Sequence, residues 1–219
     1  MAHHASAAAT EPEYPKFQIL SICRMKSHPP IVLASSSAYR KALLSRLDIR
    51  FTAISPDIDE QPLPGEAPPA TALRLAQVKA RKIAERESTA LIIGSDQVAV
   101  MDGVALGKPG QHNMAAAQLR AMSGRTVVFH TALCLLNAAT GRLQTANVPT
   151  TVRFRALDEL QIERYLHHDR PYDCAGSAKI EALGIALVEH VASDDPTALI
   201  GLPLIALVTQ LRNEGVLLP

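Results

Sequence analysis

The sequence predicts an α/β fold in which a mixed, largely central β-sheet is flanked by helices. Two observations lead to this fold class. Apolar runs with the length of buried strands alternate along the chain with amphipathic segments of helical period. In the middle of the chain, two long strand-like stretches are joined by only four residues, AATG, which is typical of an antiparallel pair. We therefore expect a sheet with both parallel and antiparallel neighbours.

The N-terminal part of this pattern contains two predicted strands and two predicted helices. Residues 31–34, IVLA, form a short apolar run of the kind found in central parallel strands, and residues 50–55 are a second strand candidate. Three serines separate the first strand from a helix over residues 38–47. A Pro-rich acidic loop then leads to a long helix over about residues 69–87, which has apolar residues at helical spacing.

The next segment predicts a strand, a hairpin and a helix. Residues 90–95 form an apolar run that ends in Gly-Ser-Asp, and Asp102-Gly103 is a strong turn signal for a hairpin that follows it. Residues 113–122 have helical composition and are followed by Ser-Gly, a common C-terminal stop.

The C-terminal half supplies the expected antiparallel pair and the last elements. The pair comprises residues 125–137 and 142–157. A helix over 158–168 opens with Asp and has Gln three residues later, as in a capping box. Residues 184–191 predict a further strand, and the apolar tail, 197–215, predicts mainly a helix.

Composition predicts one cytoplasmic domain and excludes some partners. The chain has 219 residues, 47% of them hydrophobic, and a formal net charge of +1, so it has no general attraction for nucleic acid. Its 3 cysteines show no metal spacing and are expected to be reduced thiols. No apolar run approaches the roughly 20 residues that cross a bilayer. We expect residues 1–29 to be a flexible N-terminal extension and residues 30–219 to form a single domain.

The first candidate site is the serine cluster between the first strand and the first helix. The initial turn of a helix has unpaired N–H groups and a dipole that favour anions. Ser35 is the first of the three serines, and Arg40 lies close enough in sequence to fold back over the same turn and bind phosphate oxygens. The alternative is that Ser36 or Ser37 is only an N-cap and Arg40 a solvated helix residue.

Two lysines and two acidic positions are further candidates. Lys79 and Lys108 would matter if they point at the same place as Arg40 and Asp96, and are otherwise surface lysines. Asp96 follows an apolar run, where a carboxylate needs a partner or a function. Glu60 lies in an acidic loop. The alternative for this loop is that its charged side chains are only solvated at the surface. Two carboxylates from different loops can hold a divalent cation against phosphates, and one can accept a proton from water.

These segments together resemble the Maf-like nucleotide pyrophosphatases, from about residue 31 to residue 215. The similarity rests on eight short motifs in the family's order: LASSSAYRKALLSRL, ISPDIDEQP, LRLAQVKA, LIIGSDQVAVMDG, LGKP, AMSGRTVVFHTALCL, DCAGSAKIEALGIALVE and LIGLPLIAL.

The resemblance implies a Maf/ITPase-like fold, often dimeric, and cleavage of nucleoside triphosphates between the α- and β-phosphates with Mg²⁺ or Mn²⁺. Ser35 and Arg40 match the family's phosphate site, and Asp96 matches its proton acceptor. The resemblance further implies that the two family lysines are Lys79 and Lys108, and that the loop glutamate is Glu60. We expect a metal near Glu60 and Asp96, and whether Asp96 activates water directly or through that metal stays open.

Three more positions indicate the branch of the family. The GSDQ motif and the aromatic Tyr39 resemble the branch that converts 7-methyl-GTP to 7-methyl-GMP and pyrophosphate. This reaction would remove modified nucleotides from the cell. Base choice is then expected at Tyr39, Gln97 and Glu181. N7-methylation makes guanine cationic, so the base would stack on an aromatic ring, and a carboxylate would accept its N1–H and N2–H donors.

Two alternatives stay open at this point. One is the sister branch that acts on dTTP and UTP, which typically has GADT where this chain has GSDQ. The other is a nucleotide-binding regulator of septum formation, which would bind nucleotides without cleaving them. For the main reading we expect a nucleoside triphosphate, 7-methyl-GTP, as the partner, with no nucleic-acid polymer and no membrane, and a homodimer stays open.

Overall fold

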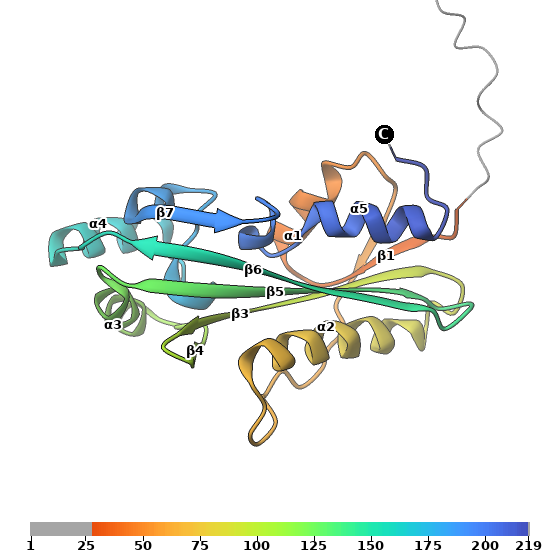
Figure 1. Cartoon of the computed structure of the whole chain (residues 1–219), viewed down its shortest axis with the longest axis horizontal. Helices are drawn as coiled ribbons and strands as arrows, with labels where there is room; N and C mark the ends of the chain where they lie inside the picture. The colour runs from red at the N-terminus through yellow and green to blue at the C-terminus, as the bar shows by residue number, and fades with distance from the viewer. Residues whose placement is uncertain (1–27, 219) are drawn as a thin grey trace, which may run out of the picture.

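The computed structural model describes residues 28–218, which form a 7-stranded mixed sheet flanked by 5 α-helices (Figure 1). The strands are β1 (Ile31–Ala34), β2 (Thr52–Ile54), β3 (Leu91–Met101), β4 (Val104–Leu106), β5 (Thr126–Asn137), β6 (Leu143–Phe154) and β7 (Val188–Ser193). The α-helices are α1 (Ala38–Ser45), α2 (Pro68–Ala84), α3 (His112–Met122), α4 (Glu159–Asp169) and α5 (Leu204–Asn213). Three short 3₁₀-helices are η1 (Ala175–Ser177), η2 (Leu183–Leu187) and η3 (Ala198–Ile200). The predicted extension lies outside the described residues, apart from residues 28 and 29.

The order of strands confirms the predicted fold class. The sheet runs β2-β1-β3-β5-β6-β7, and β4 pairs with β3 outside this path. β1 is parallel to β2 and β3, whereas β3–β5, β5–β6 and β6–β7 are antiparallel. The central pair expected from the short turn is β5–β6, so this prediction is confirmed.

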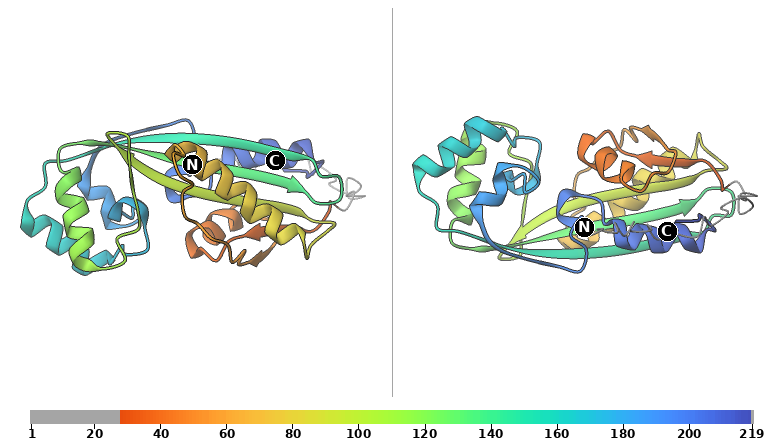
Figure 2. Two further views of the ribbon diagram at one scale, coloured as in Figure 1. Left: turned by 90° about the horizontal axis from the view of Figure 1, so that it is seen from below. Right: turned by 90° about the horizontal axis from the view of Figure 1, so that it is seen from above.

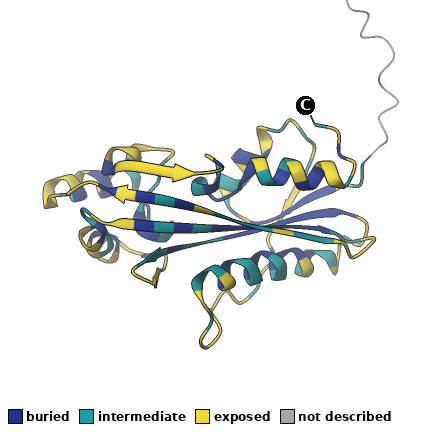
Figure 3. Cartoon of the chain, in the orientation of Figure 1, coloured by how far each residue is buried: buried dark blue, intermediate teal, exposed yellow. Residues whose placement is uncertain are grey.

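Helices cover both faces of the sheet at one end (Figures 1 and 2). The alternation of β1 shows the two faces: Val32 and Ala34 pack with α2, while Ile31 and Leu33 pack with α1 and α5. The long strands β5 and β6 continue to the other end, where α3 and α4 form a separate apolar cluster with them. β5 is buried over most of its length, whereas Figure 3 shows the edge strand β7 exposed.

The prediction that Asp96 ends its strand is wrong. β1 pairs with β3 only as far as Ile93, but β5 pairs with β3 through Val100, so the strand continues as part of an antiparallel ladder. Asp96 is therefore inside β3. It lies beyond Ile93, the last β3 residue that pairs with β1, so the edge of β3 is open at Asp96.

Two boundaries in the C-terminal part also differ from the predictions. β7 begins at Val188, because residues 183–187 form a 3₁₀-helix. The apolar tail forms η3 first, and α5 begins only at Leu204, after Gly201 in a left-handed conformation and Pro203. Gly201 and Pro203 interrupt the helical path, so the tail makes a sharp turn.

Gly94 allows α2 to lie close against β3. A Cβ atom at this residue would collide with the backbone carbonyl oxygen of Ala76 and lie 3.2 Å from Ala80 Cβ. Because Gly94 lies two residues before Asp96, the same close approach brings the α2 residue Lys79 against Asp96.

We expect Gly94→Ala to lower the free energy of unfolding by about 1–3 kcal/mol, the usual cost of overpacking. Urea denaturation measures this effect. Gly107→Ala is the matched control, because a Cβ there meets nothing within 4 Å and the backbone is not left-handed. Equal stability of the two variants would contradict the packing argument.

Candidate active site

A cleft of about 910 Å³ opens beside the ends of β1 and β2. Its walls come from both ends of the sheet, because residues that follow β1 and β2 face residues near η1 and η3. The structure brings all nine residues predicted from the sequence to this cleft: Ser35, Tyr39, Arg40, Glu60, Lys79, Asp96, Gln97, Lys108 and Glu181.

The serine turn after β1 presents a hydroxyl donor to the cleft. Ser35 is 4% exposed, and its Oγ accepts from the backbone N–H of Ser37 at 3.1 Å and lies 3.5 Å from an Arg40 N–H donor. With these lone pairs used, the hydroxyl proton is free to bind an anion. Ser37 is the N-cap of α1, as the alternative reading allowed, and its Oγ accepts from the Arg40 backbone N–H at 3.3 Å.

Arg40 is held in the cleft by the C-terminal part of the chain. Its Nε donates to the Gly201 carbonyl oxygen at 2.8 Å, and Ser95 Oγ donates to the same oxygen at 2.9 Å. Burial lowers the pKa of the guanidinium, and the charges of Asp96 and Glu60 oppose that effect. Arg40 stays cationic with part of its donor fork unused, so it is a fixed cation rather than a solvated one.

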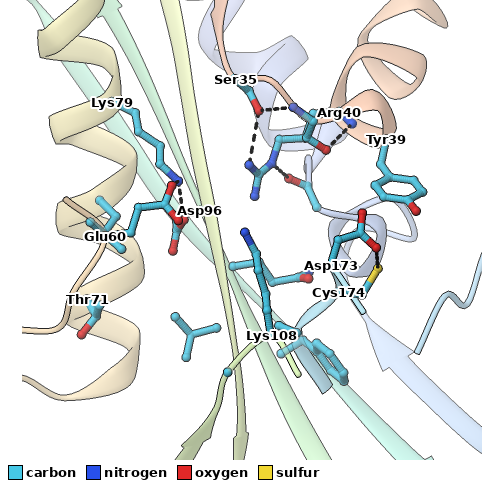
Figure 4. A pocket seen from close by; sticks show the side chains of 18 of the residues that line it. Ser35, Tyr39, Arg40, Glu60, Thr71, Lys79, Asp96, Lys108, Asp173 and Cys174 are labelled. Carbon is cyan, nitrogen blue, oxygen red and sulfur yellow. Dashed lines mark hydrogen bonds and ion pairs between the residues drawn. The ribbon is translucent and has the colours of Figure 1, made fainter. Parts of the chain in front are cut away.

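Lys79 joins the two candidate metal ligands. This lysine is 4% exposed, and its Nζ lies 2.6 Å from Asp96 Oδ1 and 2.7 Å from Glu60 Oε1 (Figure 4). Burial acts to raise the pKa of Glu60, but Lys79, Lys108 and Arg40 together outweigh it, and the net pKa lies below the ordinary value. Glu60 is therefore charged at neutral pH, and Lys79 lies between it and Asp96.

Lys108 is the exposed cation of the cleft. It follows β4, and Figure 4 shows it extending toward the space between Asp96 and Arg40. One end of the cleft is thus surrounded by Arg40, Lys79 and Lys108. The two lysines point at the same place as Arg40 and Asp96, so they meet the condition for a functional role. A chain of phosphates is the natural ligand for three converging cations.

The opposite end of the cleft is aromatic and acidic. Burial raises the pKa of the Tyr39 phenol, so its hydroxyl stays protonated. Asp173 and Glu181 line the cleft on this side, and partial burial raises the pKa of Glu181 above its ordinary value. Asp173 and Glu181 therefore add carboxylates on the side of the Tyr39 ring. At the other end the cations lie together with Glu60 and Asp96, both of which contact Lys79.

Gln97 is less free to contact a base than the sequence indicated. Its Nε2 donates to Thr131 Oγ1 at 2.8 Å and lies 3.0 Å from the carbonyl oxygens of Ala198 and Leu199. The Thr131 hydroxyl donates to Ala198 as well, so only the amide nitrogen fits here. Two N–H donors are fully used, and the Gln97 carbonyl oxygen is the group left for a ligand.

Sequence reasoning missed Lys179 and Asp173. The Lys179 Nζ lies 5.7 Å from the centroid of the Tyr39 ring, 3.0 Å from the Asp169 carbonyl oxygen and 3.8 Å from Asp173 Oδ1. Burial acts to lower the pKa of Lys179, but Tyr39, Cys174 and Asp173 together outweigh it, so the net pKa is raised. The signal was the clustering of Asp173, Lys179 and Glu181 within one motif.

A divalent cation fits the donors at the phosphate end. Within residues 28–218, no group of three or more His, Cys, Asp or Glu side chains is arranged to bind a metal. Glu60 and Asp96 are two carboxylates that converge on one point, now taken by the Lys79 ammonium. Mg²⁺ is usually bound by one or two carboxylates together with substrate phosphates, so two protein ligands are sufficient.

The fold and the cleft define an α/β protein with a charged cleft for a small anionic ligand. A family model described as "Maf-like protein" matches residues 30–214. The chain belongs to this Maf-like family.

Individual relatives are similar over most of their length. The chain is 58% identical over 188 residues to a protein of Methylobacillus flagellatus named 7-methyl-GTP pyrophosphatase, covering 86% of this chain and 98% of the relative. Proteins with the same name from Ralstonia nicotianae and Thiobacillus denitrificans are 58% and 57% identical, covering 84% and 87% of this chain and 95% of each relative. In the described part of the chain, no helix is both long and apolar enough to cross a membrane.

Proposed function

We propose that this protein hydrolyses 7-methyl-GTP to 7-methyl-GMP and pyrophosphate. The observation that carries the proposal is the arrangement of charged groups along the cleft. Arg40 and Lys108 can bind a triphosphate at one end, beside Lys79 and its two carboxylate partners. Asp173 and Glu181 lie on the side of Tyr39, where a carboxylate can attract a cationic base. The name of the relatives at 57–58% identity supports the same substrate.

In the proposed reaction, water attacks the α-phosphorus and the bond to the oxygen that bridges the α- and β-phosphates breaks. Asp96 accepts the proton of the water through Oδ2, since Oδ1 is bound to Lys79. Pyrophosphate leaves as an anion. Arg40, Lys79 and Lys108 stabilise the charge that shifts onto the leaving phosphates, and the Ser35 hydroxyl donates a hydrogen bond to a phosphate oxygen.

Mg²⁺ or Mn²⁺ would be held by Glu60 and Asp96 together with the phosphates. When bound, such an ion neutralises phosphate charge and lowers the pKa of coordinated water. Lys79 contacts both carboxylates and helps to keep the pKa of Glu60 low, so that Glu60 is ionised, which is the state that binds a cation.

Base recognition is proposed at the opposite end of the cleft. Glu181 would accept the N1–H and N2–H donors of guanine and attract its positive charge, while the Tyr39 ring packs on the base. A neutral pyrimidine would leave Glu181 without a partner, and that cost favours rejection. Gln97 would contribute its carbonyl oxygen alone.

A panel of nucleotides tests the function. Purified protein with Mg²⁺ or Mn²⁺ is given 7-methyl-GTP, GTP, dTTP and UTP, and both pyrophosphate and orthophosphate are measured. We expect pyrophosphate as the first product and the highest kcat/KM for 7-methyl-GTP. A preference for dTTP or UTP would place the protein in the sister branch, and binding without cleavage would favour the regulator.

We expect Glu181→Gln to reduce the preference for 7-methyl-GTP over UTP by about tenfold, because a charge-assisted hydrogen bond is lost while the phosphate contacts stay. The measurement is the ratio of kcat/KM for the two substrates. Glu189→Gln is the matched control, because Glu189 is exposed on β7 outside the cleft. An unchanged ratio in Glu181→Gln would move base recognition elsewhere.

A further inference from the structure

Asp195 is a buried carboxylate that does not line the cleft. It is 2% exposed, and both oxygens are bound. Oδ1 accepts from the backbone N–H of Thr197 at 2.9 Å and lies 2.6 Å from the Thr197 hydroxyl, while Oδ2 accepts from the backbone N–H of Ile205 at 2.7 Å. A carboxylate this buried is costly unless its partners need it.

These contacts fix the start of α5. The N-cap residue Pro203 has no side-chain acceptor, so the first N–H groups of the helix need acceptors from elsewhere. Thr197 Oγ1 accepts from the Leu204 N–H at 2.8 Å, and Asp195 accepts from Ile205. The negative charge of Asp195 also suits the positive end of the helix dipole.

The segment between Thr197 and Leu204 contains the carbonyl that holds Arg40. The Thr197 hydroxyl also lies 2.9 Å from the Leu202 carbonyl oxygen, one residue after Gly201. The Gly201 carbonyl oxygen accepts from Arg40 Nε at 2.8 Å. Asp195 is thus connected to Arg40 through Thr197 and one turn of backbone.

The same segment is fixed from the sheet side. Gln97 Nε2 contacts the carbonyl oxygens of Ala198 and Leu199, and Ser95 Oγ donates to Gly201. Side chains of β3 therefore hold one side of the turn, and Asp195 holds the other. With both anchors present, the Gly201 carbonyl oxygen has a defined position from which it directs the guanidinium.

We propose that Asp195 is a positioning residue for Arg40, acting through Thr197 and the Gly201 carbonyl. The proposal rests on the proposed function in one respect, that Arg40 binds substrate phosphate. Loss of the Asp195 acceptor frees the turn, so the Arg40 fork no longer meets the phosphates in one orientation. The effect is the same for every base, since the phosphates are common to all nucleoside triphosphates.

A double-mutant cycle tests this coupling. Asp195→Asn keeps the shape of the side chain but removes the charge and one acceptor. We expect it to lower kcat/KM for 7-methyl-GTP and UTP alike by about tenfold, and to change kcat/KM by less than about twofold when Arg40 is already Met. The same loss in both backgrounds, or no loss in either, would overturn the proposal.

Two further variants keep the test informative. Asp194→Asn makes the same chemical change at the exposed neighbour and should leave kcat/KM within about twofold of wild type. Thr197→Val removes the linking hydroxyl, and replaces Asp195→Asn in the cycle if that variant does not fold. Equal effects of Thr197→Val with and without Arg40 would count against the coupling.

Binding of inorganic tripolyphosphate separates this proposal from the proposed function. If the wild type cleaves no nucleotide, the proposed function fails, but the same cycle can be followed by calorimetry with tripolyphosphate. The positioning role would be supported if Asp195→Asn weakens tripolyphosphate binding when Arg40 is present and has no such effect in the Arg40→Met background. Unchanged binding in Asp195→Asn would overturn it.

Discussion

Asp96→Asn is expected to lower kcat about 10²–10⁴-fold, the usual contribution of a positioned general base, while nucleotide binding is largely kept. The amide of Asn cannot accept a proton from water at neutral pH. Its carbonyl oxygen still accepts from Lys79, which is also bound to Glu60, so the cleft keeps its shape. Steady-state kinetics and calorimetric binding of 7-methyl-GTP measure the two effects separately.

Asp48→Asn provides the control for this prediction. Asp48 is exposed, does not line the cleft, and has a left-handed backbone that Asn also adopts readily. We expect it to leave activity and stability near wild type. Full activity of Asp96→Asn would remove Asp96 from the mechanism, and loss of binding together with activity would give it a role in holding substrate instead.

Local motifs raised the candidates, and the resemblance to the Maf-like family was needed to predict which side chains gather at the cleft. Ser35 and Arg40 share one strand-to-helix turn, and that turn places both at the end of β1. Lys79 and Asp96 belong to adjacent elements, α2 and β3. Such short-range relations are readable because helix period, strand ends and turn chemistry are local properties.

The contacts of these residues could not be predicted in the same way. Gln97 is bound to Ala198, 101 residues later, and Arg40 to Gly201, 161 residues later. No local pattern encodes which carbonyl meets which donor at such separations. The expectation that Gln97 contacts a base therefore missed that its amide nitrogen is bound to carbonyl oxygens of η3. Nothing in the sequence indicated that Asp195, which lies outside α5, caps that helix.

The position of Asp96 shows the same limit within one element. The polar Ser-Asp-Gln residues suggested the end of a strand, because polar side chains usually mark that end. The structure continues β3 to Met101, since β5 offers a backbone partner as far as Val100 and β4 pairs with the last residues. Pairing with a distant strand overrode the local signal. The inference that a carboxylate after an apolar run needs a partner or a function was unaffected, since Asp96 contacts Lys79 in the cleft.

Lys79→Met is expected to lower kcat/KM about 10²–10³-fold, because it removes a cation from the phosphate end of the cleft and the partner of the candidate base. Stability should fall as well. Asp96 is 8% exposed and would face Glu60 without the ammonium between them. Breaking a buried pair costs about 3–5 kcal/mol, and the open cleft and half-exposed Glu60 reduce this to roughly 2 kcal/mol.

The pH dependence of that stability loss separates charge from packing. Lys79 holds the pKa of Glu60 below its ordinary value of 4.5, so this stabilisation is present above pH 4.5 and is lost as the pH falls. The difference in unfolding free energy between wild type and Lys79→Met should therefore be largest near neutral pH and shrink below pH 4.5. Lys82→Met, on the exposed side of the same helix, should show a small difference at every pH. A loss in Lys79→Met that is independent of pH would attribute the effect to packing of the lysine stem instead of to its charge.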